Sequence, residues 1–145
     1  MKKILVALCI LGIILSSYLT YVHYVPEELD TSFCNISGYL SCSTVNRSSF
    51  ATFLGIPVAL LGVIVFFGML FLVADRIKHG HIALFLVSLA SFLFMMYLTF
   101  TELFIINAIC ILCVAVAIIA TFILVISFRI YKYEIIQFFK ELRIE

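Results

Sequence analysis

Long apolar runs dominate the chain and predict helices that cross a membrane. A helix needs about 20 apolar residues to span the ~30 Å hydrocarbon core of a bilayer. Residues 4–25 form one such run, which Pro26 closes, and residues 56–74 form a second, with Pro57 at its start. Proline suits the first turn of a helix, because its missing N–H would lack a partner there. The first run exceeds the apolar stretch of a signal peptide, and no small-residue cleavage site follows it.

A third apolar run, residues 82–128, is roughly twice as long as one span requires. Glu102 and Asn107 are its strongly polar interruptions, so we expect a tight turn between them. The turn divides the run into spans at 82–101 and 107–128. Asn107 is a suitable N-cap for the last helix, because an Asn side chain accepts hydrogen bonds from the first backbone N–H groups.

Composition agrees with a bilayer environment. Hydrophobic residues make up 66% of the 145 residues and charged residues 12%, whereas a soluble domain is about 45–50% apolar and about 25% charged. The net charge is +1 and no cluster of Lys and Arg occurs, which argues against a nucleic-acid partner. We therefore predict an all-α integral membrane protein, with residues 1–145 forming one four-helix transmembrane bundle.

The basic residues predict the orientation of this bundle. Four spans put both termini on one side, and eight basic residues then share that face. Arg47 alone lies on the other face. Basic residues collect on the cytoplasmic side of membrane proteins. We expect the termini in the cytoplasm, and residues 26–55 and 102–107 outside the cell membrane. The eight residues of the basic face are Lys2, Lys3, Arg76, Lys78, Arg129, Lys132, Lys140 and Arg143.

The outer loop contains one further predicted element. Residues 43–54 alternate small polar residues with Val45, Phe50 and Phe53. This pattern is typical of a short helix that lies at the membrane interface. An irregular loop with a few buried apolar side chains fits the same pattern nearly as well.

Four of the five cysteines fall on the outer side in this topology. Cys34 and Cys42 lie in the long loop, separated by seven residues, and Cys110 and Cys113 form a C-x-x-C at the start of the last span. The outer side is the oxidising compartment, where disulfides persist. Cys9 lies inside the first span and is interpreted as a small buried hydrophobic residue.

A C-x-x-C at a helix N-terminus favours redox chemistry. Unpaired backbone N–H groups and the helix dipole favour a thiolate, which is the form that attacks disulfides. At membrane depth, a lipid-soluble quinone is a suitable reaction partner for it. Two inert structural disulfides are an alternative. A four-cysteine zinc site is a weaker one, because the spacing is loose and no His is near, so no metal is expected. Glu102 is interpreted as a solvated boundary residue, or alternatively as an influence on protonation of the C-x-x-C.

A specific combination of motifs runs through nearly the whole chain. It consists of two cysteines separated by seven residues, a Gly-Ile-Pro before the second span, and a C-x-x-C that follows Glu102. Together these residues resemble the vitamin K epoxide reductase family, in its prokaryotic branch without a fused thioredoxin-like domain. The segments that carry the resemblance are Cys34–Phe53, Leu54-Gly55-Ile56-Pro57, Ala59-Leu60-Leu61-Gly62, Glu102-Leu103 and Ala108–Cys113.

The resemblance implies a four-helix bundle around a quinone of the menaquinone or ubiquinone type. It implies that Cys34 accepts electrons from a thioredoxin-like partner through a mixed disulfide. Cys42 would relay them to Cys110, and Cys113 would face the quinone. Each transfer between cysteines is a thiol–disulfide exchange. Because the chain ends soon after the last span, we expect the partner to be encoded separately.

Two departures from the family pattern bear on the reaction. Vertebrate members have a Tyr four residues after the second active-site cysteine and an Asn four residues before the glycine of the second span. The corresponding residues here are Ala117 and Ala51, so the polar contacts to the quinone are unassigned. The pattern therefore favours a membrane thiol oxidase that forms disulfides. The alternatives are a quinone or epoxide reductase proper, and a non-catalytic membrane module stapled by its two cysteine pairs.

Overall fold

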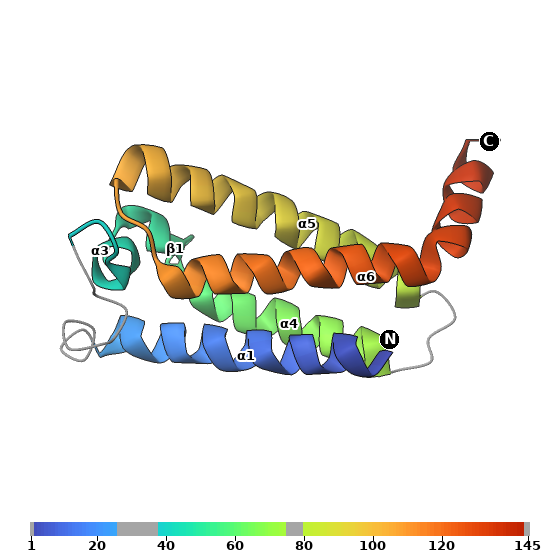
Figure 1. Cartoon of the computed structure of the whole chain (residues 1–145), viewed down its shortest axis with the longest axis horizontal. Helices are drawn as coiled ribbons and strands as arrows, with labels where there is room; N and C mark the ends of the chain where they lie inside the picture. Colours follow the sequence, from blue (N-terminus) through green and yellow to red (C-terminus); the bar gives the residue numbers. More distant parts are fainter. Residues whose placement is uncertain (1, 26–37, 75–79, 144–145) are drawn as a thin grey trace.

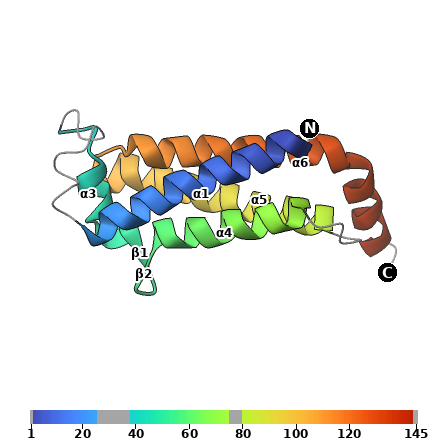
Figure 2. The ribbon, with the colours of Figure 1, turned by 90° about the horizontal axis from the view of Figure 1, so that it is seen from below.

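A bundle of four long helices makes up most of the molecule (Figure 1). The structure is a computed structural model and describes residues 2–25, 38–74 and 80–143. Helix α1 packs against α4 and α6, and α5 also packs against both of these helices. Two views at right angles show the helices running along a common axis (Figures 1 and 2). The bounds are α1 (Lys2–Tyr24), α4 (Val58–Ala74), α5 (Gly80–Thr101) and α6 (Ile111–Leu142).

Three helical segments are long and apolar enough to cross a membrane. They are α1, α5 together with the turn that extends it to Ile106, and α6 as far as Tyr133. Helix α4 is also apolar but has 17 residues, which at a rise of 1.5 Å per residue gives about 25 Å. This is slightly less than the ~30 Å hydrocarbon core. The chain is therefore a membrane protein, with α4 as a shorter apolar helix in the bundle.

The connection between α5 and α6 differs from the predicted tight turn. A π-helical turn, η2 (Glu102–Ile106), continues α5, and Asn107 ends it in a left-handed conformation with φ 54°. Asn tolerates this conformation better than most residues. The expectation that Asn107 caps the last helix is wrong, because Cys110 is the N-cap and α6 begins at Ile111.

The outer segment folds into more pieces than predicted. It contains the helix α3, a short 3₁₀ turn η1, and a two-stranded hairpin, β1 and β2. Leu54 and Gly55 form the hairpin turn with φ values of 53° and 81°, as a two-residue turn of type I′ requires. A short helix is thus present, but it ends well before residue 54. The bounds are α3 (Cys42–Asn46), η1 (Ser49–Ala51), β1 (Thr52–Phe53) and β2 (Ile56–Pro57).

A seam of small residues holds α1 close to α4. A Cβ added at Gly12 would lie 2.6 Å from the ring of Phe66, and one added at Gly62 would lie 3.0 Å from the Ser16 hydroxyl oxygen. Small residues at such positions let two helix backbones approach closely within a membrane. Cys9 is fully buried in this core, in agreement with its interpretation as a small hydrophobic residue.

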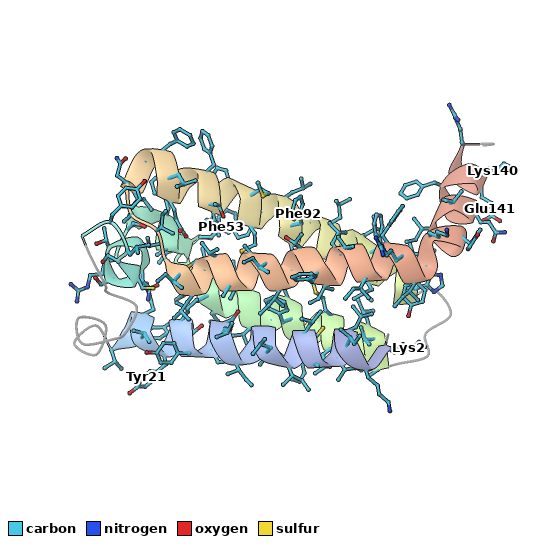
Figure 3. All side chains as sticks on the ribbon, viewed as in Figure 1. Lys2, Tyr21, Phe53, Phe92, Lys140 and Glu141 are labelled. Carbon is cyan, nitrogen blue, oxygen red and sulfur yellow. The ribbon has the colours of Figure 1, made fainter. Side chains whose placement is uncertain are left out.

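The two ends of the bundle carry different parts of the chain. The start of α1 and the end of α6 lie at one end, and α3 with the hairpin lies at the other (Figure 1). Side chains show the same division, with Lys2 and Lys140 at one end and Tyr21 toward the other (Figure 3). Arg47 follows α3 and so belongs to the second end. Two basic residues of the predicted cytoplasmic loop, Arg76 and Lys78, lie outside the described residues.

Candidate functional site

Two backbone hydrogen bonds join segments that are far apart in the sequence. The Ile109 N–H donates to the Tyr39 carbonyl at 2.8 Å, and the Ser41 N–H donates to the Ile109 carbonyl at 3.2 Å. They form a parallel bridge between the outer loop and the residues before α6. The next residue along each segment is a cysteine, Cys42 and Cys110 respectively. The bridge therefore places these two cysteines beside each other.

The sulfur atoms of Cys42 and Cys110 are in direct contact. They lie 3.0 Å apart, and the Cys110 thiol donates to Sγ of Cys42. Cys42 is disulfide-bonded, whereas Cys110 is a free thiol. Both are buried, with Cys110 0% and Cys42 3% exposed. A thiol so close to a disulfide sulfur has the proximity that thiol–disulfide exchange requires.

The C-x-x-C forms the N-terminus of α6. Sγ of Cys110 accepts a hydrogen bond from the Cys113 backbone N–H at 3.4 Å, so the cysteine caps its own helix. The first N–H groups of a helix and its dipole favour negative charge at this position. The side chain of Cys113 is half-buried and also a free thiol. The local geometry therefore places both thiols of the C-x-x-C in and beside the first turn of α6.

Glu102 is buried beside the C-x-x-C, and its interpretation as a solvated boundary residue is wrong. It is only 5% exposed, because the π-helical turn directs it into the bundle. Its Oε2 accepts a hydrogen bond from the Cys110 N–H at 3.2 Å, and it lines the same cavity as Cys113. The acid therefore lies beside the C-x-x-C and is bonded to its first residue.

A polar contact fastens α3 to the end of α1. Nδ1 of His23 lies 3.2 Å from both the backbone oxygen and Oδ1 of Asn46, and Nδ2 of Asn46 donates to the Leu19 carbonyl at 3.4 Å. Since α3 begins at Cys42, this contact helps to hold that cysteine over the bundle. Sequence reasoning did not identify His23 or Asn46, because no spacing rule pairs residues from two separate elements.

A cavity lies under α3, between α1, α4, α5 and α6. Its wall is mostly apolar, with a few hydroxyl, amide and carboxyl groups, as is usual for small-molecule sites. Cys113 and Glu102 both line it. Ala51 also lies in the wall, whereas Ala117 does not. Other residues of the cavity wall are Ser16, Asn46, Val58, Ala59, Gly62, Met95 and Thr99.

A second, apolar hollow adjoins this cavity between α4 and α5. The two share Val58, Gly62 and Met95 in their walls. In the wall of the larger cavity, Ser16 is 2% exposed and contributes a hydroxyl group. The cavity thus combines an apolar extension with a hydroxyl in its wall.

The predicted site residues fall into three groups in the structure. Cys42 and Cys110 are brought together, and Cys113 faces the cavity from the first turn of α6. Cys34 lies outside the described residues. Within the described ranges, no group of three or more His, Cys, Asp or Glu side chains is arranged to hold a metal ion.

Comparison with known protein families gives one match for the chain. Residues 3–128 match the family described as "Vitamin K epoxide reductase family". The match covers most of the chain, including every cysteine of the candidate site. A search of curated proteins finds no match.

Proposed function

Because this chain belongs to the vitamin K epoxide reductase family, we propose that it is a membrane thiol oxidase that passes electrons from a thioredoxin-like partner to a quinone. Membership of the family implies quinone-linked redox activity in a membrane. The observation that carries the finer proposal is the 3.0 Å contact between the Cys110 thiol and the disulfide-bonded sulfur of Cys42. This contact supports direct electron transfer between the loop cysteines and the C-x-x-C.

The first half of the reaction oxidises the partner. A thiolate of the partner attacks Cys34, which breaks the Cys34–Cys42 bond and forms a mixed disulfide. The second thiol of the partner then displaces Cys34, leaving an oxidised partner and two loop thiols. In this proposal, as the family resemblance implies, the bonding partner of Cys42 is Cys34.

The second half moves the electron pair inward. The Cys42 thiolate attacks the Cys110 sulfur of an oxidised C-x-x-C, and Cys113 leaves as a thiolate. Cys34 then displaces Cys110 from Cys42, which restores the loop disulfide and leaves both residues of the C-x-x-C reduced. Each step exchanges one thiolate for another. Burial of the Cys42–Cys110 contact favours this exchange over reactions with thiols in solution.

The cavity beside Cys113 suits the quinone ring. It is mostly apolar, and the Ser16 hydroxyl in its wall is a group that could donate to a quinone carbonyl. A quinone bound there supplies the two-electron acceptor, and Cys113 is the thiol that faces it. The apolar hollow between α4 and α5 suits an isoprenoid tail, as menaquinone and ubiquinone both carry.

The distribution of charge supports the predicted topology. We propose that α4 crosses the membrane with the three longer helices, so that the chain has four spans. Six of the eight basic residues of the predicted inner face are described, and they lie in the segments near the start of α1 and the end of α6. The cysteine site lies at the opposite end, next to Arg47. By the positive-inside rule, the site then faces the outside of the cell membrane.

Disulfide formation fits the cavity better than reduction of an epoxide. The position that carries an Asn in vertebrate members is Ala51 here, and it lies in the cavity wall. An alanine donates no side-chain hydrogen bond to a quinone or epoxide oxygen. Thiol oxidation requires only that the ring accept electrons from Cys113.

The test uses purified protein, a small dithiol and a short-tailed quinone under anaerobic conditions. Wild-type protein should oxidise the dithiol while the absorbance of the quinone falls in equal amount. Cys113→Ser should lose this activity at least 100-fold, and the matched variant Cys9→Ala should retain it. Undiminished activity in Cys113→Ser would contradict the proposed route of electrons. Comparing a benzoquinone with a naphthoquinone identifies the preferred ring.

A further inference from the structure

Glu102 is an acid in a place where an acid is costly. It lies at the outer end of α5 and is almost fully buried, and burying a charged carboxylate costs several kcal/mol unless it is compensated. No Lys, Arg or His lines the adjacent cavity in the described part of the chain. An ion pair therefore does not account for this residue. Ionisable groups retained inside membrane proteins commonly serve function.

The contacts of Glu102 connect the thiols to the cavity. Its Oε2 accepts the Cys110 N–H at 3.2 Å. The Cys113 N–H in turn donates to the Cys110 sulfur at 3.4 Å. Glu102 and Cys113 line the same cavity wall. Thus one carboxyl group is bonded to the C-x-x-C and borders the space in which the oxidant is proposed to bind.

The proposed reaction needs a group at this position that carries protons from the thiols to the quinone. Oxidation of the Cys110 and Cys113 thiols forms one S–S bond, breaks two S–H bonds, and transfers two electrons and two protons to a quinone. The protons must cross a site whose walls are mostly apolar. Burial favours the neutral form of a carboxyl group, whereas a hydrogen bond from an N–H group favours the charged form. Glu102 is both buried and bonded to the Cys110 N–H.

We propose that Glu102 carries protons from the Cys113 thiol to the quinone oxygen. Its carboxylate accepts the proton of Cys113 and delivers it to one quinone oxygen, which restores the carboxylate. The same carboxylate, which is bonded to the Cys110 N–H, then takes the Cys110 proton, and this second proton goes to the other quinone oxygen. This role rests on the proposed function, and it makes Glu102 a catalytic residue beside the cysteines.

The deciding variant is Glu102→Gln. Gln keeps the size of Glu and an oxygen that accepts the Cys110 N–H, but its amide does not accept and release protons as a carboxyl group does. General acid–base catalysis contributes about 10²–10⁴-fold, so single-turnover oxidation of the reduced protein by a quinone should slow about 100-fold. Glu102→Asp should recover part of the rate, and the exposed control Glu141→Gln should match wild type. A Glu102→Gln rate within about twofold of wild type would overturn the role and leave Glu102 as a cap.

A second readout requires no quinone. In quinone-free protein, the infrared difference spectrum between oxidised and reduced C-x-x-C should contain a carboxyl band that Glu102→Gln lacks. The absence of that band in wild type would contradict proton exchange between Glu102 and the thiols. Wild-type protein that reduces no quinone would instead contradict the proposed function, and the infrared band would then decide the role of Glu102 separately.

Discussion

The α1–α4 seam makes the stability of the bundle sensitive to one methyl group at Gly12. In Gly12→Ala the new Cβ would lie 2.6 Å from two ring atoms of Phe66, whereas ordinary contacts begin at 3.4 Å. The ring would have to retreat by about 0.8 Å, the difference between these two distances. Phe66 is only 2% exposed, so this movement must displace its neighbours. Overpacking of this kind typically costs about 1–3 kcal/mol.

Gly68→Ala is a matched control on α4. A Cβ at Gly68 meets nothing within 4 Å, and both variants gain the same helix propensity, about 0.5–1 kcal/mol for Gly to Ala. The difference between their unfolding free energies therefore isolates the overpacking at Gly12. We expect Gly12→Ala to be less stable than Gly68→Ala by about 1–3 kcal/mol.

The assay is equilibrium unfolding in detergent micelles, followed by circular dichroism. The double variant Gly12→Ala/Phe66→Leu should regain part of the loss, because the smaller side chain leaves room for the methyl group. One helical turn from Gly12, Ser16 contacts Gly62 in the cavity wall, so the apparent affinity for quinone should fall as well. Equal stability of Gly12→Ala and Gly68→Ala would refute the close approach of α1 and α4.

Two further predictions concern topology and the cavity. In a chain whose native cysteines are replaced by Ala, Gly38→Cys should react with a membrane-impermeant maleimide in intact cells, and Lys140→Cys should react only after permeabilisation. The opposite pattern would place the site in the cytoplasm. Ser16→Ala should raise the KM for quinone about tenfold, because it loses a hydrogen bond of about 1 kcal/mol or slightly more. Thr121→Ala removes a hydroxyl that is bonded to its own helix and should leave the KM unchanged. An unchanged KM in Ser16→Ala would exclude a hydrogen bond between Ser16 and the quinone.

Much of the helical framework follows from sequence because lipid leaves few alternatives. Apolar runs in a bilayer must satisfy their backbone hydrogen bonds internally, and a helix does so within one segment. The predicted runs 4–25 and 82–101 accordingly lie close to α1 and α5. The last helix begins at Ile111 rather than at residue 107. The π-helical turn Glu102–Ile106 extends α5, and residues 107–110 then connect it to α6.

The site itself depends on contacts that no local pattern encodes. Cys42 and Cys110 are 68 residues apart. They are aligned by two backbone hydrogen bonds that Ile109 makes, one with Tyr39 and one with Ser41. Any backbone segment can make such bonds, so composition and spacing do not identify them. Glu102 was misinterpreted for a related reason. Its burial depends on how one turn directs its side chain, whereas its position in the sequence indicates only the end of a span.

The relay between the two cysteine pairs has a direct chemical test. In Cys34→Ser/Cys113→Ser, Cys42 and Cys110 lose every competing partner in the site. Their sulfurs already lie 3.0 Å apart, so under oxidising conditions this variant should accumulate a Cys42–Cys110 disulfide. Non-reducing digestion and mass spectrometry would detect the linked peptides, and Cys34→Ser/Cys110→Ser serves as the matched control. If Cys42 and Cys110 instead remain two free thiols, electrons do not pass between them and the cysteines are structural.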